Sequence, residues 1–260
     1  MRKQLASLTS RGRHLVTVED AANRLDVNRV EAAKTMARWA EQGWLRRVRR
    51  GLYIAVPVDV EHPERWSEDP MVLATVVWEP CYFTGWTAGN YWGLTEQVFK
   101  TVVVKTTKRV RSPSQTLLDH RLLIGRIAED KLSWGLRTVW IKGLMVRLAV
   151  EARVIIDVLG EPKIGGGIRH SAEMLSTYLA EHDRQRLLEY GDRFGNRTVF
   201  KRLGFLCESL GLADGAFLDQ CAQRISSGTT TLDPSAPKGG VRNSRWGLRI
   251  NVRFERPAAS

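Results

Sequence analysis

The sequence lacks long apolar runs and has few cysteines. No stretch of about 18 consecutive apolar residues occurs in the 260 residues, which excludes an ordinary membrane-spanning helix. The basic N-terminal segment has no uninterrupted apolar core of the signal-peptide kind, so we expect a cytoplasmic protein that does not bind membranes. The three cysteines are widely spaced and form no C-x-x-C pair, which argues against a disulfide framework and against a zinc site.

Motifs of catalysis are also scarce. The five histidines are scattered without an H-E-x-x-H pattern, and no nucleophile elbow occurs. Asp157 forms no recognisable nuclease triad with Glu151 or Glu173. We therefore expect no catalytic residues, no metal site, no cofactor and no enzymatic activity. A metal-dependent nuclease targeted to DNA is the least favoured alternative.

Positive charge is abundant and unevenly distributed. The net charge is +12, from 40 lysines and arginines against 28 acidic residues, and the 43% hydrophobic content is enough for a sizeable core. Residues 1–57 hold 12 of the basic residues and 5 of the acidic ones. Such an asymmetry is expected where one small module binds a polyanion.

Two helices are predicted in this basic segment. The stretch "EDAANRL" fits a short helix that ends near Asp26 and has acidic residues in its first turn, where they favour the helix dipole. Asn28 can cap a second helix, and Glu31 can reach back to the cap in an Asn-led capping box. Gly43 should end this helix after Gln42.

The second helix is predicted to be amphipathic. At about 100° per residue, one face gathers small and apolar residues with Val30 at its edge, and we expect this face to be buried. Its members are Ala33, Met36, Ala37 and Ala40. The polar face consists of Glu31, Lys34, Thr35, Arg38 and Gln42.

A β-hairpin is predicted directly after the helices. The runs "WLRRV" and "GLYIAV" have strand character and flank Arg49-Arg50-Gly51 at the reversal. Helix, helix and hairpin together form a winged helix-turn-helix, whose second helix enters the major groove of DNA.

This arrangement predicts the residues that bind double-stranded DNA. Contacts to phosphates are expected from the hairpin arginines Arg46, Arg47, Arg49 and Arg50. Contacts to base edges are expected from Asn28, Arg29, Lys34, Thr35 and Arg38. The alternative is a solvated charged face on a module that docks to other proteins.

The rest of the chain predicts a larger second domain. The stretch from Val56 to Pro70 is rich in proline and acid, and its residues 58–69 are predicted as a linker between a domain at 1–57 and one at 70–260. Two helices, the first starting at Pro70, should precede strands at 98–107, 120–127 and 135–150, with Lys142-Gly143 as a tight turn. Five helical segments and a final strand follow. The fold class is therefore α+β: a winged helix-turn-helix followed by a larger mixed α/β domain.

Three further features have alternative interpretations. "KIGGGIRH" could hold a phosphate, although a flexible turn between helices is favoured. A second basic patch is proposed on one predicted helix, with a solvated helix face as the equal alternative; its residues are Arg197, Lys201 and Arg202. Five tryptophans within apolar stretches are predicted as core anchors in preference to platforms on which bases stack: Trp78, Trp86, Trp92, Trp134 and Trp140.

Several segments in this order resemble the AbiEi family of bacterial antitoxins. They are "YFTGWTAGNYWGLTEQVFKTVVVKTTKR", "RVIIDVLGEPKIGGGIRH", "YGDRFGNRTVFKRLGFLCESLG" and "RWGLRINVRF". The family's E-R-T-L-[LI]-D helix corresponds to residues 152–157, where Arg153 and Asp157 match while Ala152 and Val154 depart from the pattern.

The resemblance implies an antitoxin of a type IV toxin-antitoxin system, a system first met in phage defence. Its winged helix would bind inverted repeats and repress its own operon, and its C-terminal domain would counteract a nucleotidyltransferase-like toxin without necessarily forming a stable complex. Inverted repeats would require two copies on DNA. The runner-up is a transcription factor whose second domain senses a ligand or partner.

Overall fold

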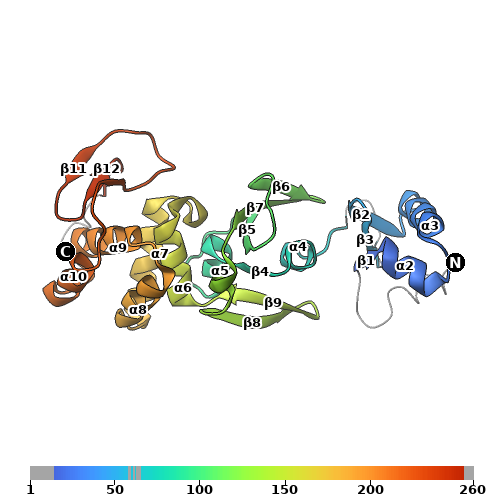
Figure 1. Cartoon of the computed structure of the whole chain (residues 1–260), viewed down its shortest axis with the longest axis horizontal. Helices are drawn as coiled ribbons and strands as arrows, with labels where there is room; N and C mark the ends of the chain where they lie inside the picture. The colour runs from blue at the N-terminus through green and yellow to red at the C-terminus, as the bar shows by residue number, and fades with distance from the viewer. Residues whose placement is uncertain (1–14, 58–59, 61, 63–65, 255–260) are drawn as a thin grey trace.

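The computed structural model describes residues 15–57, 60, 62 and 66–254 of an elongated α+β protein. One of the five scattered histidines, His14, and part of the predicted linker lie outside the described residues. Figure 1 shows a small sheet with two helices at one end, a larger sheet in the middle and a group of helices at the other end. Within the described part of the chain, no helix is long and apolar enough to cross a membrane.

The N-terminal part is a winged helix-turn-helix, as predicted. Its antiparallel sheet has the order β1 (Leu15–Thr17), β3 (Leu52–Ala55), β2 (Leu45–Arg49). Helix α2 (Val18–Leu25) begins with a capping box in which Thr17 and Asp20 bond each other's backbone amides. Helix α3 (Arg29–Glu41) follows after a short turn.

The buried face of α3 differs from the prediction. Ala32, Met36 and Trp39 are fully buried, whereas Ala37 and Val30 are exposed. Trp39 decides the rotation, because burying this large ring removes more apolar surface from water than burying alanines does. The helix is therefore turned by about one residue relative to the expected orientation.

Strand β3 is buried on both of its faces. Tyr53 and Ala55 pack with α2 and α3, whereas Leu52 and Ile54 belong to the main core of the protein. The small sheet therefore packs against the following part of the chain. The division at residues 57 and 70 stays a prediction.

A six-stranded mixed sheet forms the middle of the molecule. Its order is β6 (Ser114–Leu117), β7 (His120–Arg126), β5 (Thr101–Thr106), β4 (Cys81–Phe83), β9 (Leu144–Ala149), β8 (Leu136–Ile141). Helix α4 (Pro70–Trp78) is capped by Asp69 and starts at proline, as expected, and α5 (Gly85–Tyr91) follows β4. Strands β4 and β6 were not predicted.

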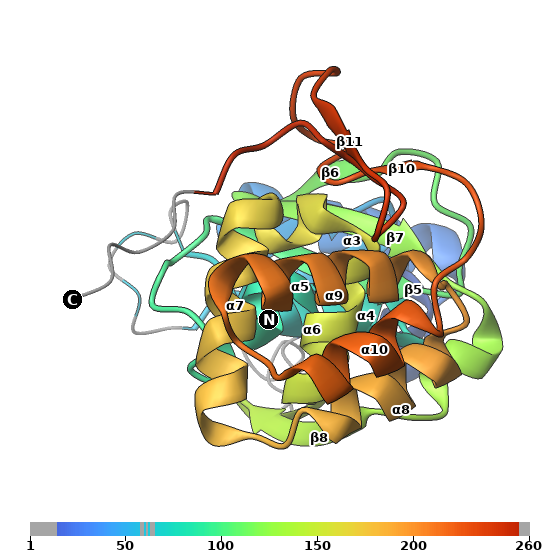
Figure 2. The ribbon, with the colours of Figure 1, turned by 90° about the vertical axis from the view of Figure 1, so that its left-hand side faces the viewer.

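Helices cover the end of the sheet far from the N-terminus (Figure 2). They are α6 (Glu151–Gly160), α7 (Ile168–Glu181), α8 (Gln185–Phe194), α9 (Thr198–Leu210) and α10 (Gly215–Ala222), with 3-10 turns η1 (Glu129–Leu132) and η2 (Pro162–Gly165). A small sheet of β10 (Thr230–Thr231), β12 (Leu248–Ile250) and β11 (Val241–Asn243) completes the fold. It lies beside α9, where a side chain at Gly204 would clash with the Trp246 ring.

Candidate nucleic-acid interface

Helix α3 presents a cationic face to solvent. The Asn28 side chain caps the helix, since its Oδ1 accepts hydrogen bonds from the amides of Val30 and Glu31 at 3.0 and 2.9 Å. Lys34 and Arg38 are exposed one turn apart. Val30 lies one turn before Lys34 and is 64% exposed. This face therefore combines two cations with an isopropyl group, a chemistry that suits guanine edges and thymine methyl groups.

The other predicted base contacts are less uniform. Arg29 is exposed at the start of α3, whereas Thr35 is partly buried. The Asn28 side chain is exposed, but its oxygen is already used by the helix cap. The roles of Asn28, Arg29 and Thr35 in base recognition stay predictions.

The four hairpin arginines separate into two groups. Arg47, Arg49 and Arg50 are exposed. The Arg46 side chain is only 19% exposed, and its guanidinium donates to the Trp66 carbonyl and, at 3.2 Å, to the Asp119 carboxylate. Arg46 therefore connects the small sheet to the turn between β6 and β7. Its predicted contact to a phosphate stays a prediction.

A groove is lined by the second half of α3, the strands β2 and β3, and the turn between β6 and β7. Its volume is about 770 Å³, and its lining includes Ala37 and Gln42 of the helix segment, Arg46 and Arg47 of β2, and Leu118 of the β6–β7 turn. The second half of α3 therefore lies close to the β6–β7 hairpin. Two distant cationic segments of the sequence therefore border the same groove.

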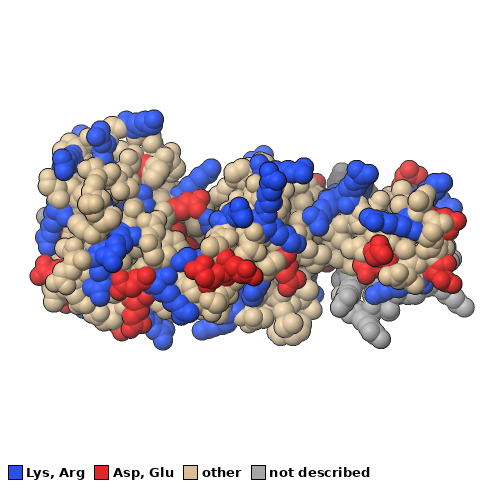
Figure 3. Space-filling view, in the orientation of Figure 1, with Lys and Arg blue, Asp and Glu red and all other residues tan. Residues whose placement is uncertain are grey.

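The second of these segments escaped the sequence prediction. Residues 100–126 contain seven basic residues and one acidic residue, Asp119. The exposed cations are Lys100, Lys108, Arg109, Arg111, Arg121 and Arg126. Figure 3 shows basic side chains gathered over the β6–β7 region and continuing toward the N-terminal part. A local charge count over 100–126 would have found this segment.

The predicted basic patch on α9 is not a surface patch. Lys201 and Arg202 are 0% and 2% exposed, and only Arg197 is exposed. Lys201 Nζ donates to the carbonyl of Gly228 at 2.8 Å, and Arg202 donates to the carbonyls of Leu159, Leu232 and others. Burial lowers the pKa of Arg202 to about 10, although Asp233 partly opposes this. Both cations hold loops against α9 instead of facing a ligand.

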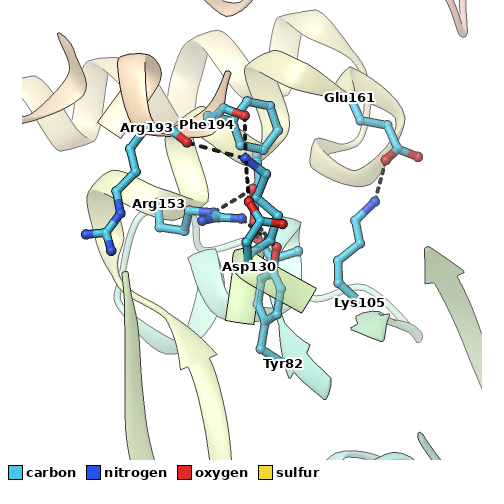
Figure 4. A network of polar contacts seen from close by, with 10 residues as sticks. Tyr82, Lys105, Asp130, Arg153, Glu161, Arg193 and Phe194 are labelled. Atoms are coloured by element: carbon cyan, nitrogen blue, oxygen red, sulfur yellow. Dashed lines mark hydrogen bonds and ion pairs between the residues drawn. The ribbon is translucent and has the colours of Figure 1, made fainter. Parts of the chain in front are cut away.

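A buried polar network surrounds Arg153 (Figure 4). Its Nε donates to Asp157 at 2.8 Å and its Nη2 to the Tyr82 hydroxyl at 3.1 Å. The guanidinium lies 3.7 Å from the centre of the Trp134 ring. Burial alone would lower the pKa of Arg153, but the Asp157 carboxylate raises it.

Both carboxylate oxygens of Asp157 accept hydrogen bonds within this network. Its Oδ2 accepts hydrogen bonds from Tyr82 and Thr84 at 3.0 and 2.7 Å, and its side chain is buried. Burial and the negative charge of Asp157 raise the pKa of Tyr82 well above its usual value. The network ties α6 to β4, and its carboxylate faces protein donors.

The glycine-rich loop is a turn between helices, as favoured by the sequence. The backbone adopts positive φ at Gly166 and Gly167, immediately before α7. The Asp233 carboxylate accepts a hydrogen bond from the Ile168 amide at 2.8 Å, at the position where a phosphate would bind. The N-terminus of α7 is thus occupied by a residue of the chain itself.

Possible metal ligands and the five predicted core tryptophans were the remaining candidate features of the sequence. Among the described residues, no group of three or more histidine, cysteine, aspartate or glutamate side chains could hold a metal ion. Of the five tryptophans predicted as core anchors, Trp78, Trp86 and Trp134 are buried and Trp92 is partly buried. Trp140 is 69% exposed, so its prediction was wrong.

Comparisons with known proteins agree with the winged helix. None of the curated proteins compared with the chain matches it. The solved structure of the RV2827C protein from Mycobacterium tuberculosis is similar to this chain, with a TM-score of 0.59 and 15% sequence identity. The alignment covers 94% of this chain and 88% of the RV2827C chain. This likeness shows the fold alone. Residues 3–56 match the family model described as "Transcriptional regulator, AbiEi antitoxin". The resemblance to AbiEi antitoxins is therefore confirmed over residues 3–56, a segment that matches a family of transcriptional regulators.

Proposed function

We propose that the chain is an antitoxin that represses its own operon through its winged helix and counteracts a nucleotidyltransferase-like toxin. The observation that carries the DNA-binding part is the exposed pair Lys34 and Arg38 on a capped helix, within a segment that matches a family of regulators. The toxin partner follows from the AbiEi resemblance.

In this proposal α3 occupies the major groove of operator DNA. Lys34 and Arg38 donate to base edges, and Val30 contacts a thymine methyl group. Arg47, Arg49 and Arg50 bind phosphates and set the register of the protein on the duplex. The exposed cations of residues 100–126 extend the backbone contact, because the groove beside α3 also borders the β6–β7 turn.

The environment of Asp157 favours this proposal over a nuclease. A metal ligand needs free carboxylate lone pairs, but the two oxygens of Asp157 accept hydrogen bonds from Arg153, Tyr82 and Thr84. The site is organised to hold a buried arginine.

DNA binding is tested by titrating the purified chain against the DNA upstream of its gene. We expect a protected site with inverted symmetry, as two copies on DNA would give. Arg38→Ala should relax sequence preference by about 1–3 kcal/mol at one position of each half-site. Arg249→Ala is the matched control, since Arg249 is exposed on the small C-terminal sheet. Equal loss on operator and random DNA would reassign Arg38 to the phosphate backbone.

Antitoxin action is tested by co-expressing this chain with the product of the neighbouring gene. The neighbour should stop growth alone, and this chain should restore it. A neighbour that is harmless alone, or that stays lethal beside this chain, would contradict the antitoxin part while leaving the DNA-binding part intact.

A further inference from the structure

Two large apolar side chains are exposed together on the β8–β9 hairpin. Trp140 is 69% exposed and Met145 is 59% exposed, and they are directly opposite each other in the strand register. Opposite residues in an antiparallel pair have Cβ atoms about 4.5–5.5 Å apart, so the two side chains form one apolar surface. Tryptophan is among the residues that most often dominate the energy of a protein interface.

The two edges of the six-stranded sheet differ in how they are protected. Strand β6 has four residues, follows Pro113 and is mostly polar, which discourages pairing with another chain. Strand β8 has six residues of sequence "LRTVWI" without proline. Among the described strands β8 pairs only with β9, so its outer edge offers backbone donors and acceptors for strand addition.

The hairpin is also cationic. The hairpin, residues 136–149, contains three basic residues, Arg137, Lys142 and Arg147, and no acidic residue. Lys142 Nζ lies 3.9 Å from the Glu68 carboxylate, which offsets part of this charge. Met145 and Arg147 border a hollow of about 270 Å³, which Glu79 and Cys81 also line. Two copies of such a hairpin would repel each other, so the charge favours a partner with carboxylates over a second copy of this chain.

The hairpin lies on the side of the sheet opposite to the β6–β7 cations. The sheet order places β6 and β8 at its two edges, and Figures 1 and 2 both show them on opposite sides of the molecule. A protein on β8 would therefore leave the basic side open to DNA.

We propose that the β8–β9 hairpin is the docking site for an extended acidic segment of the protein that this chain counteracts. The segment adds a strand to β8, its apolar side chains pack on Trp140 and Met145, and its carboxylates face Arg147 and Lys142. This inference rests on the proposed antitoxin function and names the surface that performs it.

Growth rescue during co-expression with the neighbouring gene tests the apolar surface. We expect Trp140→Ala combined with Met145→Ala to abolish rescue, while DNA affinity and the melting temperature stay close to those of the wild type. Val241→Ala is the control, because Val241 is 77% exposed on another sheet. Trp140→Phe keeps an aromatic ring and should retain rescue, which separates loss of contact from loss of folding.

The outcomes separate this inference from the proposed function. If the double variant folds and rescues growth like the wild type, the docking site is overturned while the antitoxin function stands. If the wild type itself fails to rescue growth, both the proposed antitoxin function and this inference are contradicted.

Direct binding tests the charge and the class of partner. With the purified product of the neighbouring gene immobilised, we expect the double variant to bind about tenfold more weakly or worse. Arg147→Glu combined with Lys142→Glu should also weaken binding. Unchanged affinity for that protein, together with weakened binding of single-stranded DNA, would overturn the proposal and make the hairpin a nucleic-acid surface.

Discussion

Basic side chains have opposite roles in the two ends of this molecule. In the winged helix, Arg38, Arg49 and Arg50 are exposed, where a polyanion can reach them. In the helical end, Arg153 and Arg202 are buried and bond to a carboxylate or to backbone carbonyls. Charge in the sequence therefore identifies neither DNA contacts nor structural anchors until burial is known.

The largest expected effect on stability comes from Asp157→Ala. Removing this partner leaves the Arg153 charge buried without compensation, which should cost about 3–5 kcal/mol of unfolding free energy. Urea unfolding measures it. Replacing the pair together, by Arg153→Met with Asp157→Leu, should recover much of the loss. A single variant as stable as the wild type would mean that the network contributes nothing to the fold.

A smaller loss is expected for Arg202→Met. Methionine keeps much of the packing but leaves several carbonyls without their donor, which should cost about 1–3 kcal/mol. Arg197→Met, at an exposed position of the same segment, should change stability by less than about 0.5 kcal/mol. Thermal and urea unfolding of both variants provide the check; equal effects would contradict the burial of Arg202.

Acid stability should depend on Asp233. Burial would raise its pKa, but hydrogen bonds from Ser235 and from the Ile168 amide outweigh burial and lower it. A lowered folded-state pKa gives stability that is present above the unfolded value near 3.9 and is lost as the pH falls through the folded value. Asp233→Asn should therefore flatten the fall in unfolding free energy below about pH 4. An unchanged acid profile would refute this assignment.

Arg46 is the intermediate case between the two groups. Its pair with Asp119 is partly exposed, so Arg46→Ala should cost only about 0.5–1 kcal/mol. Because its guanidinium is directed at Asp119 and Trp66, the salt dependence of DNA binding should change less than in Arg47→Ala. A larger change in salt dependence for Arg46→Ala than for Arg47→Ala would instead support a phosphate contact by Arg46.

The sequence predicted local features well where short-range chemistry decides them. The Asn28 cap, the start of α4 at Pro70 and the hairpin after Gly43 all follow from residue preferences within one turn. The class α+β followed from the order of these elements.

Burial was harder to predict because it depends on distant segments. Lys201 and Arg202 resemble a solvated helix face until the loop at 227–232 covers them. Trp140 lies in an apolar run typical of a core strand, yet β8 is an edge strand with one exposed face. The packing of distant segments determines both outcomes, and no local pattern encodes it.

The salt dependence of DNA binding tests the central claim most directly. For the wild type, log K against log salt should be linear, and Arg49→Ala with Arg50→Ala should lower the slope by up to about 2, since each lost phosphate contact changes it by about 0.9. Stability should stay within about 0.5 kcal/mol of the wild type. Arg202→Met, measured where it is folded, should leave the slope unchanged. An unchanged slope in the double variant, or a reduced slope in Arg202→Met, would contradict the division between exposed DNA-binding cations and buried structural ones.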